Sequence, residues 1–304
     1  MQIIKFSLIF SGYFCDIARK KSKISLSVNK KETEMKSLQK PIKIVFFDID
    51  DTLYVKHKAY IPKSITEQVL PRLKAKGIIP AIATGRNHGC FPEALKPYLN
   101  PEIGFELFVT INGQYNFYKD QIISDYSLSR EQIERIIEKA NALGILYAFI
   151  TPMTIAVSET NPIVHEAVLP ITPNYLIDPH YYEKEKIVQM LLFYTEEQKQ
   201  AVENSGIFAN DLKEARWHPN AVDILRKENS KARGIQDVLA TLNIEIESAM
   251  AFGDGINDLE MLPTVGVGVA MGNGVPELKA VADFITKPLE EDGILYALET
   301  LEVI

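Results

Sequence analysis

The sequence predicts an α/β protein in which a parallel β-sheet core is interrupted by an inserted α+β domain. Continuous apolar runs at 44–47 and 78–83 flank a segment with helical spacing, and this strand–helix–strand order is typical of parallel sheets buried on both faces. Residues 115–228 differ, because helical stretches and strand-like runs are mixed there and several prolines break up the middle. The strand–helix pattern returns at 229, which indicates one core built from two separated parts of the chain.

This pattern divides the chain into four segments. We expect an N-terminal extension at 1–40, the first part of the core at 41–114, the inserted domain at 115–228 and the second part of the core at 229–304. The extension holds an apolar stretch followed by a basic one. A signal peptide is one interpretation, but no Ala-x-Ala-like cleavage site follows. We expect instead that Met35 is the natural start and that the extension is disordered or misassigned.

The composition is typical of a soluble globular protein. The 304 residues suffice for two domains, and 46% of them are apolar and 24% charged. A net charge of −7 argues against a general nucleic-acid binder, and no apolar run reaches the ~18 residues needed to cross a membrane. The two cysteines suit a reducing compartment. We expect a cytoplasmic monomer or homodimer with neither nucleic-acid nor membrane partners.

The first strand runs directly into three carboxylates. Ile44–Phe47 is followed by Asp48, Asp50 and Asp51 within four positions. Side chains alternate along a strand, so Asp48 and Asp50 leave on the same side if the strand geometry persists. Two such charges beside a buried strand require a cation, and Mg²⁺ prefers oxygen ligands. The alternative is an acidic turn that caps a helix at Thr52.

A helix and a second buried strand come next. Ser64, with Glu67 three residues on, predicts a capping box, and apolar residues at helical spacing continue to Gly77, where we expect the helix to stop. The strand at 78–83 ends in Thr84-Gly85-Arg86. A hydroxyl followed by glycine at a strand end can hydrogen-bond a phosphate oxygen, although an ordinary turn has the same composition.

The chain leaves the core after a further strand at 108–111. Asn112-Gly113 predicts a hairpin turn there. In the inserted domain, Tyr181–Tyr182 and Trp217–His218 could face a substrate, but packing is the more frequent role of such aromatics. No cluster of Asp, Cys or His has metal spacing in this domain. The pattern predicts helices at 129–143 and 196–205, and strands at 146–150, 155–157, 187–194 and 221–225.

Lys231 lies at the start of the first helix after the insertion. Ser230 is a natural N-cap, which places Lys231 in the first helical turn. A cation there opposes the helix dipole, and such a breach of local preference is expected of a functional residue. The alternative is a solvated lysine, which tolerates this position at small cost.

The most specific stretch follows the strand at 248–252. Asp254 lies between two glycines in Gly253–Leu262, so a tight turn can direct its carboxylate across the strand ends. Asn257 and Asp258 then begin a helix, where they can act as caps or hold neighbouring ligands in place.

These four stretches resemble, in order, the four motifs of the haloacid dehalogenase superfamily of phosphohydrolases. They are Asp48-x-Asp50-x-Thr52, Thr84-Gly85, the helix start at Lys231 and Gly253–Leu262, which is similar to the superfamily's GDGxNDxxML. The Asn-Gly turn and the C-terminal pattern resemble the Cof-like branch, although its SKG motif here has its glycine displaced to 234. The resemblance implies a Rossmann-like parallel-sheet core with an inserted α+β cap domain that closes over the substrate.

The resemblance also implies a role for each motif residue. Asp48 would be the nucleophile and Asp50 the general acid and then the base, whereas Asp51 would only start a helix. Mg²⁺ would be the cofactor. Its ligands would be Asp48, the backbone carbonyl of Asp50, and Asp254, with Asn257 and Asp258 orienting the metal site, while Thr84, Gly85 and Lys231 would hold the phosphoryl oxygens.

The expected activity is that of a phosphoric monoester hydrolase. We expect Mg²⁺-dependent hydrolysis of a small phosphorylated metabolite, with sugar phosphates implied by the resemblance, through an aspartyl-phosphate. A phosphosugar mutase on the same core and a non-catalytic binding protein on this scaffold are the alternatives. The chain has no GxxxxGK[ST], and the turn after its first strand carries Asp in place of GxGxxG, which disfavours a P-loop enzyme and a dinucleotide dehydrogenase.

Overall fold

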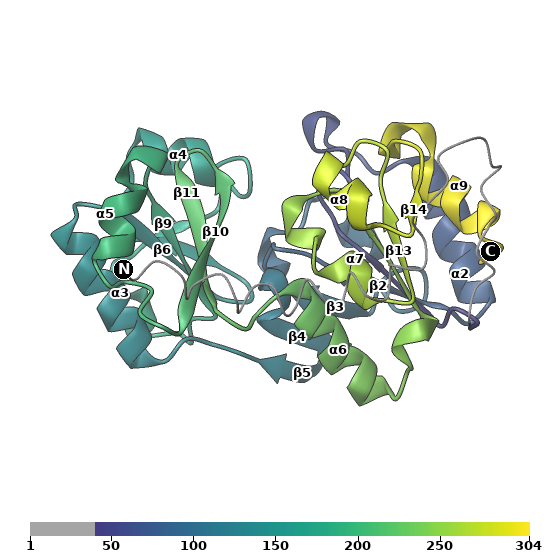
Figure 1. Cartoon of the computed structure of the whole chain (residues 1–304), viewed down its shortest axis with the longest axis horizontal. Coiled ribbons are helices and arrows are strands. Elements are labelled where there is room, and N and C mark those ends of the chain that lie inside the picture. The colour runs from purple at the N-terminus through teal and green to yellow at the C-terminus, as the bar shows by residue number, and fades with distance from the viewer. Residues whose placement is uncertain (1–39) are drawn as a thin grey trace, which may run out of the picture. The chain divides into compact units, whose positions relative to one another are not determined.

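The computed structural model describes residues 40–304, so the expectations for the N-terminal extension lie outside the described residues. Two β-sheets organise this part of the chain (Figure 1). The first is eight-stranded and parallel from β14 to β3, with β4 and β5 added antiparallel. The predicted α/β core is confirmed. Its strand order is β14 (Phe284–Ile285), β13 (Val267–Ala270), β12 (Ala249–Gly253), β1 (Ile44–Phe47), β2 (Ile79–Ala83), β3 (Leu107–Thr110), β4 (Tyr115–Tyr118) and β5 (Gln121–Asp125).

Strand β1 lies inside this sheet and is buried on both faces. Val45 and Phe47 belong to one apolar cluster, whereas Ile44 and Phe46 belong to another on the opposite face. Helices cover both faces, which explains the continuous apolar run. The first cluster includes residues of α2 (Leu70–Ala75) and α9 (Gly293–Thr300), and the second includes residues of α6 (Lys231–Leu242), α7 (Met261–Thr264) and α8 (Pro276–Val281).

The second sheet is formed by the inserted part of the chain. It is antiparallel except for the pairing of β7 with β8. The predicted helices and strands are present, and β8, β10 and α4 are additional. The strand order is β10 (Leu212–His218), β11 (Ala221–Arg226), β9 (Gln189–Phe193), β6 (Leu146–Ile150), β7 (Ile155–Val157) and β8 (Leu176–Ile177), and the helices are α3 (Arg130–Ala142), α4 (Pro162–Val168) and α5 (Lys199–Asn204).

The sheets place the start of the insertion later than the expected residue 115. The Asn112-Gly113 turn does form a hairpin, because β4 pairs antiparallel with β3. Strand β5 then pairs with β4, so both strands extend the first sheet. The segment that builds the second sheet therefore begins after Asp125.

Two local predictions at helix starts were wrong. Ser64 already has a helical backbone (φ −56°, ψ −35°), and its hydroxyl donates to Asp292 Oδ1 at 2.5 Å instead of capping the helix. A short π-helical turn (Ile65–Val69) leads from it into α2. Asp51 starts no helix: it adopts a left-handed φ of 56° in a turn and accepts a hydrogen bond from the Lys56 backbone N–H.

The displaced glycine of α6 has a packing role. A Cβ at Gly234 would lie 2.6 Å from Val109 Cγ1 and 2.8 Å from Gly113 Cα. Helix propensity alone predicts that Gly234→Ala stabilises the protein by about 1 kcal/mol. We expect the opposite sign, a loss of about 1–3 kcal/mol in the free energy of unfolding, because the helix must move away from β3.

Urea unfolding of Gly234→Ala checks this expectation. Ala240→Gly, at an exposed position of the same helix, is the matched control for propensity. A stabilised Gly234→Ala protein would contradict the close packing.

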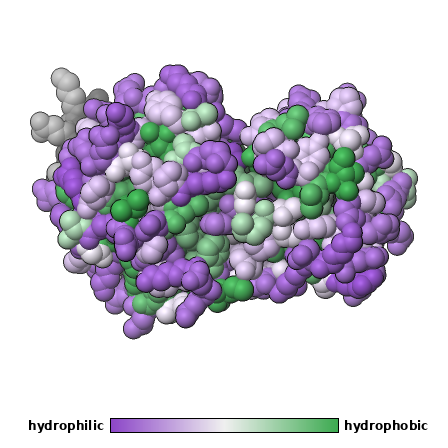
Figure 2. Space-filling model, turned by 180° about the vertical axis from the view of Figure 1, so that it is seen from behind, coloured by the Kyte–Doolittle hydropathy of each residue, from purple (hydrophilic) through white to green (hydrophobic). Residues whose placement is uncertain are grey.

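No helix within residues 40–304 is long and apolar enough to cross a membrane. Figure 2 shows hydrophilic side chains over most of one face of the molecule, with hydrophobic residues in smaller patches.

Candidate active site

Three of the four motifs meet at the carboxyl ends of neighbouring strands. Strand β1 pairs in parallel with β12 on one side and β2 on the other, so Asp48, Asp254 and Thr84 follow the same edge of the sheet. The fourth motif contributes Lys231 from the start of α6. All four residues line one cavity of about 890 Å³, whose other wall comes from the second sheet. Ligands of open α/β sheets bind at this edge.

Three carboxylates form the centre of the site. Asp48, Asp254 and Asp258 each offer one oxygen, and these oxygens lie within 4.8 Å of one another. Burial, together with repulsion from neighbouring carboxylates, raises the pKa of Asp48 to about 7 and that of Asp254 to about 8. Such a set of hard oxygen donors fits a divalent cation, which would remove the repulsion.

Lys231 is buried against two of these carboxylates. Its Nζ donates to Asp48 Oδ1 at 2.5 Å and to Asp258 Oδ1 at 2.7 Å, and its side chain is 1% exposed. Burial alone would lower the pKa of Lys231, but the charges of Asp258 and Asp48 outweigh it and raise the pKa. The Ser230 side chain caps α6 as expected. The alternative of a solvated lysine is therefore wrong.

The carboxylate of Asp258 is one of the three at the centre of the site, together with those of Asp48 and Asp254. The backbone N–H groups of Asp254 and Gly255 donate to its Oδ2, each at 3.0 Å. A Cβ at Gly253 would lie 2.5 Å from the carboxylate of Asp258, so only glycine leaves it this place. Asn257 lines the cavity. Its expected role in orienting the metal site stays a prediction.

The carboxylate of Asp50 points to a different partner. Arg86 Nε and Nη2 donate to its two oxygens, both at 2.7 Å. Burial alone would raise the pKa of Asp50, but Arg86 lowers it below the ordinary value. Arg86 Nη1 also donates to the carbonyls of Cys90 and, in the inserted segment, Ile171. The expected metal contact of Asp50 is through its backbone carbonyl and stays a prediction.

Thr84 and Gly85 both line the cavity. Thr84 is 1% exposed, and its Oγ1 accepts a hydrogen bond from the Arg86 backbone N–H at 3.1 Å. A Cβ at Gly85 would lie 3.1 Å from Asn112 Oδ1, so glycine leaves room for that amide. Phosphate binding by these two residues stays a prediction.

Comparison with known proteins decides the family. The family model described as haloacid dehalogenase-like hydrolase matches residues 45–298. This chain belongs to the haloacid dehalogenase-like hydrolases. A Bacillus subtilis (strain 168) protein named "Putative phosphatase YkrA" is 40% identical over 261 residues, which cover 85% of this chain and 97% of that protein.

Solved structures agree with this assignment. A hypothetical protein from Geobacillus kaustophilus is 38% identical with a TM-score of 0.77, over 86% of this chain and all of that chain. The subclass IIB sugar phosphatase BT4131 is 30% identical with a TM-score of 0.75 over the same shares. The predictions of a Cof-like haloacid dehalogenase hydrolase and of a phosphoric monoester hydrolase are confirmed.

Sequence reasoning missed two residues of this haloacid dehalogenase-like site. Arg86 directly follows Thr84-Gly85, and this place next to the second motif was the one feature of the sequence that could have identified it as a site residue. Thr52 is part of the first motif, is fully buried, and donates from Oγ1 to Asp254 Oδ1 at 2.8 Å. Both hold a carboxylate in place through hydrogen bonds, and neither residue type by itself indicates that role.

The two aromatic pairs of the inserted segment, Tyr181–Tyr182 and Trp217–His218, differ in their position relative to the cavity. Trp217 lines the cavity. Tyr181 and Tyr182 pack instead against the apolar cluster under α3, where the Tyr182 ring lies 5.6 Å from Phe149. His218 accepts a hydrogen bond from the Asn220 backbone N–H. Packing thus accounts for the tyrosine pair.

Proposed function

We propose that this chain is a Mg²⁺-dependent phosphatase that hydrolyses a small phosphorylated metabolite, a sugar phosphate, through an aspartyl-phosphate. The observation that carries the proposal is the position of Asp48, whose carboxylate contacts Lys231 and neighbours Asp254 and Asp258 in a cavity that Asp50 also lines. The relationship to a sugar phosphatase of the family supports the substrate class. The protein acts as a cytoplasmic monomer or homodimer.

Asp48 performs the first half of the reaction. One of its oxygens forms a bond to phosphorus, and the bond from phosphorus to the leaving alcohol breaks. Lys231 and Thr84 hold the non-bridging phosphoryl oxygens, while Asp50 gives a proton to the leaving oxygen. Asp48, Asp254 and the Asp50 backbone carbonyl would hold Mg²⁺, which would supply positive charge to the transferring group.

Asp50 performs the second half. Its carboxylate takes a proton from water, the water oxygen bonds to phosphorus, and the acyl-phosphate bond to Asp48 breaks to release inorganic phosphate. The pair with Arg86 favours the charged form of Asp50; this suits the base step and opposes the acid step, which needs the protonated form. Closure of the second-sheet wall excludes bulk water from the intermediate.

Phosphate release from a panel of sugar phosphates and from 4-nitrophenyl phosphate tests the proposal. We expect release from at least one sugar phosphate with Mg²⁺ and its loss with EDTA. A phosphosugar mutase would instead move the phosphoryl group to another hydroxyl, with a bisphosphate activator and no net release. A chain that released phosphate from no ester would contradict hydrolysis.

A further inference from the structure

Asp223 is a carboxylate of the cavity that the proposed chemistry does not use. It lies on β11, in the wall formed by the second sheet, and lines the same cavity as Asp48 and Lys231. Asn112, from the turn after β3, donates from Nδ2 to Asp223 Oδ2 at 2.9 Å. This hydrogen bond joins the two walls of the cavity.

The surroundings of Asp223 favour binding of a hydrogen-bond donor. Burial raises its pKa to about 7, although the neighbouring side chains of Asn112, Trp217 and Gln189 favour its charged form. All three of these partners are uncharged, so neutral donors hold the carboxylate. A carboxylate accepts several hydrogen bonds, and a further donor from a ligand would stabilise it.

Asn112 is held in place by an unfavourable backbone. Ile111 and Asn112 both have φ near +52°, a left-handed conformation that is a genuine outlier for a β-branched residue. Their backbone N–H groups donate to the carbonyls of Arg86 and Thr84, which keeps the turn against the phosphate site. Strain of this kind gathers at functional sites.

The amide of Asn112 also has an unused acceptor. Its Oδ1 is buried and has no hydrogen-bond partner within residues 40–304. Gly85 leaves the space beside this oxygen. An unsatisfied buried acceptor is costly, so a donor supplied by a ligand is favoured here.

A buried chain of amides begins on β9, the strand that pairs with the strand of Asp223. Gln189 Oε1 accepts from Gln114 Nε2 at 3.1 Å, and Gln114 Oε1 accepts from Asn229 Nδ2 at 3.2 Å. These three side chains are at most 2% exposed. They link β9 of the second sheet to the residues just before β4 and α6, and Asn229 is two residues before Lys231. The carboxylate is therefore preorganised relative to the phosphate site.

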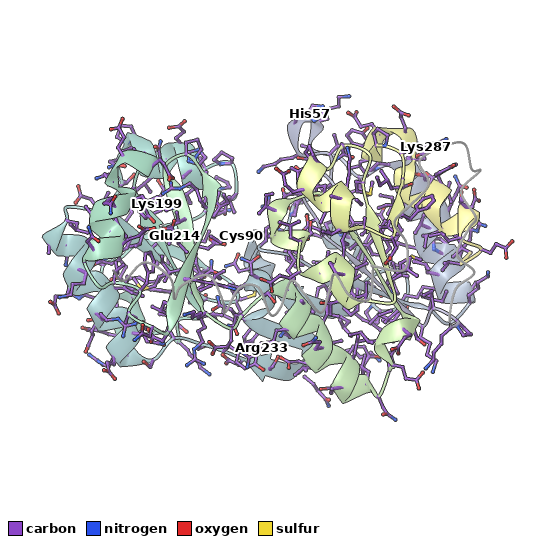
Figure 3. All side chains as sticks on the ribbon, viewed as in Figure 1. His57, Cys90, Lys199, Glu214, Arg233 and Lys287 are labelled. Atoms are coloured by element: carbon purple, nitrogen blue, oxygen red, sulfur yellow. The ribbon has the colours of Figure 1, made fainter. Side chains whose placement is uncertain are left out.

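We propose that Asp223 and Asn112 form the subsite that binds a hydroxyl group of the leaving alcohol, so that polyhydroxylated phosphate esters are the preferred substrates. This inference rests on the proposed phosphatase function. The same wall carries Lys199, Lys213 and Arg216. Lys199 pairs with Glu214 at 3.4 Å (Figure 3) and Arg216 pairs with Glu196 at 3.1 Å, so carboxylates already neutralise two of these three cations.

Asp223→Asn tests the subsite, because asparagine keeps the shape but replaces one acceptor oxygen by a donor. We expect kcat/KM for the best sugar phosphate to fall about 10- to 100-fold, and kcat/KM for 4-nitrophenyl phosphate, whose leaving group has no other hydroxyl, to change less than about 3-fold. Glu214→Gln, a carboxylate of the same wall, is the matched control and should change both ratios less than about 3-fold.

Deoxy analogues of the same sugar phosphate give the second readout. For the native enzyme, kcat/KM should fall by a similar factor when the analogue lacks the contacted hydroxyl. For Asp223→Asn, this analogue and the parent ester should have the same kcat/KM. Equal losses on both kinds of ester would give Asp223 a purely structural role and overturn the inference. So would unchanged sugar phosphate hydrolysis, or a preference for an amino-sugar phosphate over its hydroxyl parent.

Binding separates this inference from the proposed function. The Kd of the sugar phosphate is measured by calorimetry in the Asp48→Asn background, with and without Asp223→Asn. A weakening of about 10-fold or more supports the subsite even if the native chain releases no phosphate. An unchanged Kd overturns it even if the native chain is an active phosphatase.

Discussion

Replacing Asp48 by asparagine is expected to lower kcat for phosphate release by at least about 10⁴-fold, the scale seen when an enzyme loses its nucleophile. The amide of asparagine cannot form the acyl-phosphate. The substitution also removes one of the three carboxylates, those of Asp48, Asp254 and Asp258, that could hold a metal ion. Steady-state phosphate release with saturating Mg²⁺ measures the effect. Trapping of phosphorylated protein after acid quench, present in the native enzyme and absent from the variant, measures the nucleophile directly.

Asp51→Asn is the matched control for this substitution. Asp51 belongs to the same motif and lines the same cavity, but it is not one of the three clustered carboxylates. Asparagine tolerates its left-handed backbone, so the fold should be preserved. We expect less than about a 3-fold change in kcat. Comparable losses in both variants would place the nucleophile elsewhere.

Replacing Lys231 by methionine is expected to remove activity and to lower the free energy of unfolding by about 3 kcal/mol without metal. Methionine has a similar unbranched shape, so the main change is the lost charge. Asp48 and Asp258 would then remain buried beside each other with no cation between them. Urea unfolding with and without Mg²⁺ measures the effect. Mg²⁺ should restore part of the stability by binding to the clustered carboxylates.

Two further variants make this test specific. Lys139→Met removes a partly exposed lysine of α3 and should change the free energy of unfolding by at most about 0.5 kcal/mol. The double variant Asp48→Asn, Lys231→Met removes both charges of the buried pair and should lose less than the sum of the single losses. Additive losses, or a Lys231→Met protein as stable as Lys139→Met, would contradict the buried ion pair.

The core strands were predictable because their signal is local. A strand buried on both faces is apolar at every position, and β1, β2 and β12 therefore appear as continuous runs. The start of the insertion was not predictable in this way. Strands β4 and β5 are the last two strands at one edge of the first sheet and are partly exposed. Their mixture of apolar and polar residues therefore resembles that of the inserted segment.

The sequence by itself determined the α/β core, the family and the candidate residues for the chemistry, because the four motifs are short and each lies at a strand end or a helix start. Only the tertiary structure decided how these residues combine. It joined Asp258 to the carboxylates of Asp48 and Asp254, paired Asp50 with Arg86, and brought Asn112 to Asp223, which is 111 residues away. Such contacts depend on parallel strand pairing and on the position of the second sheet, and neither leaves a local pattern in the chain.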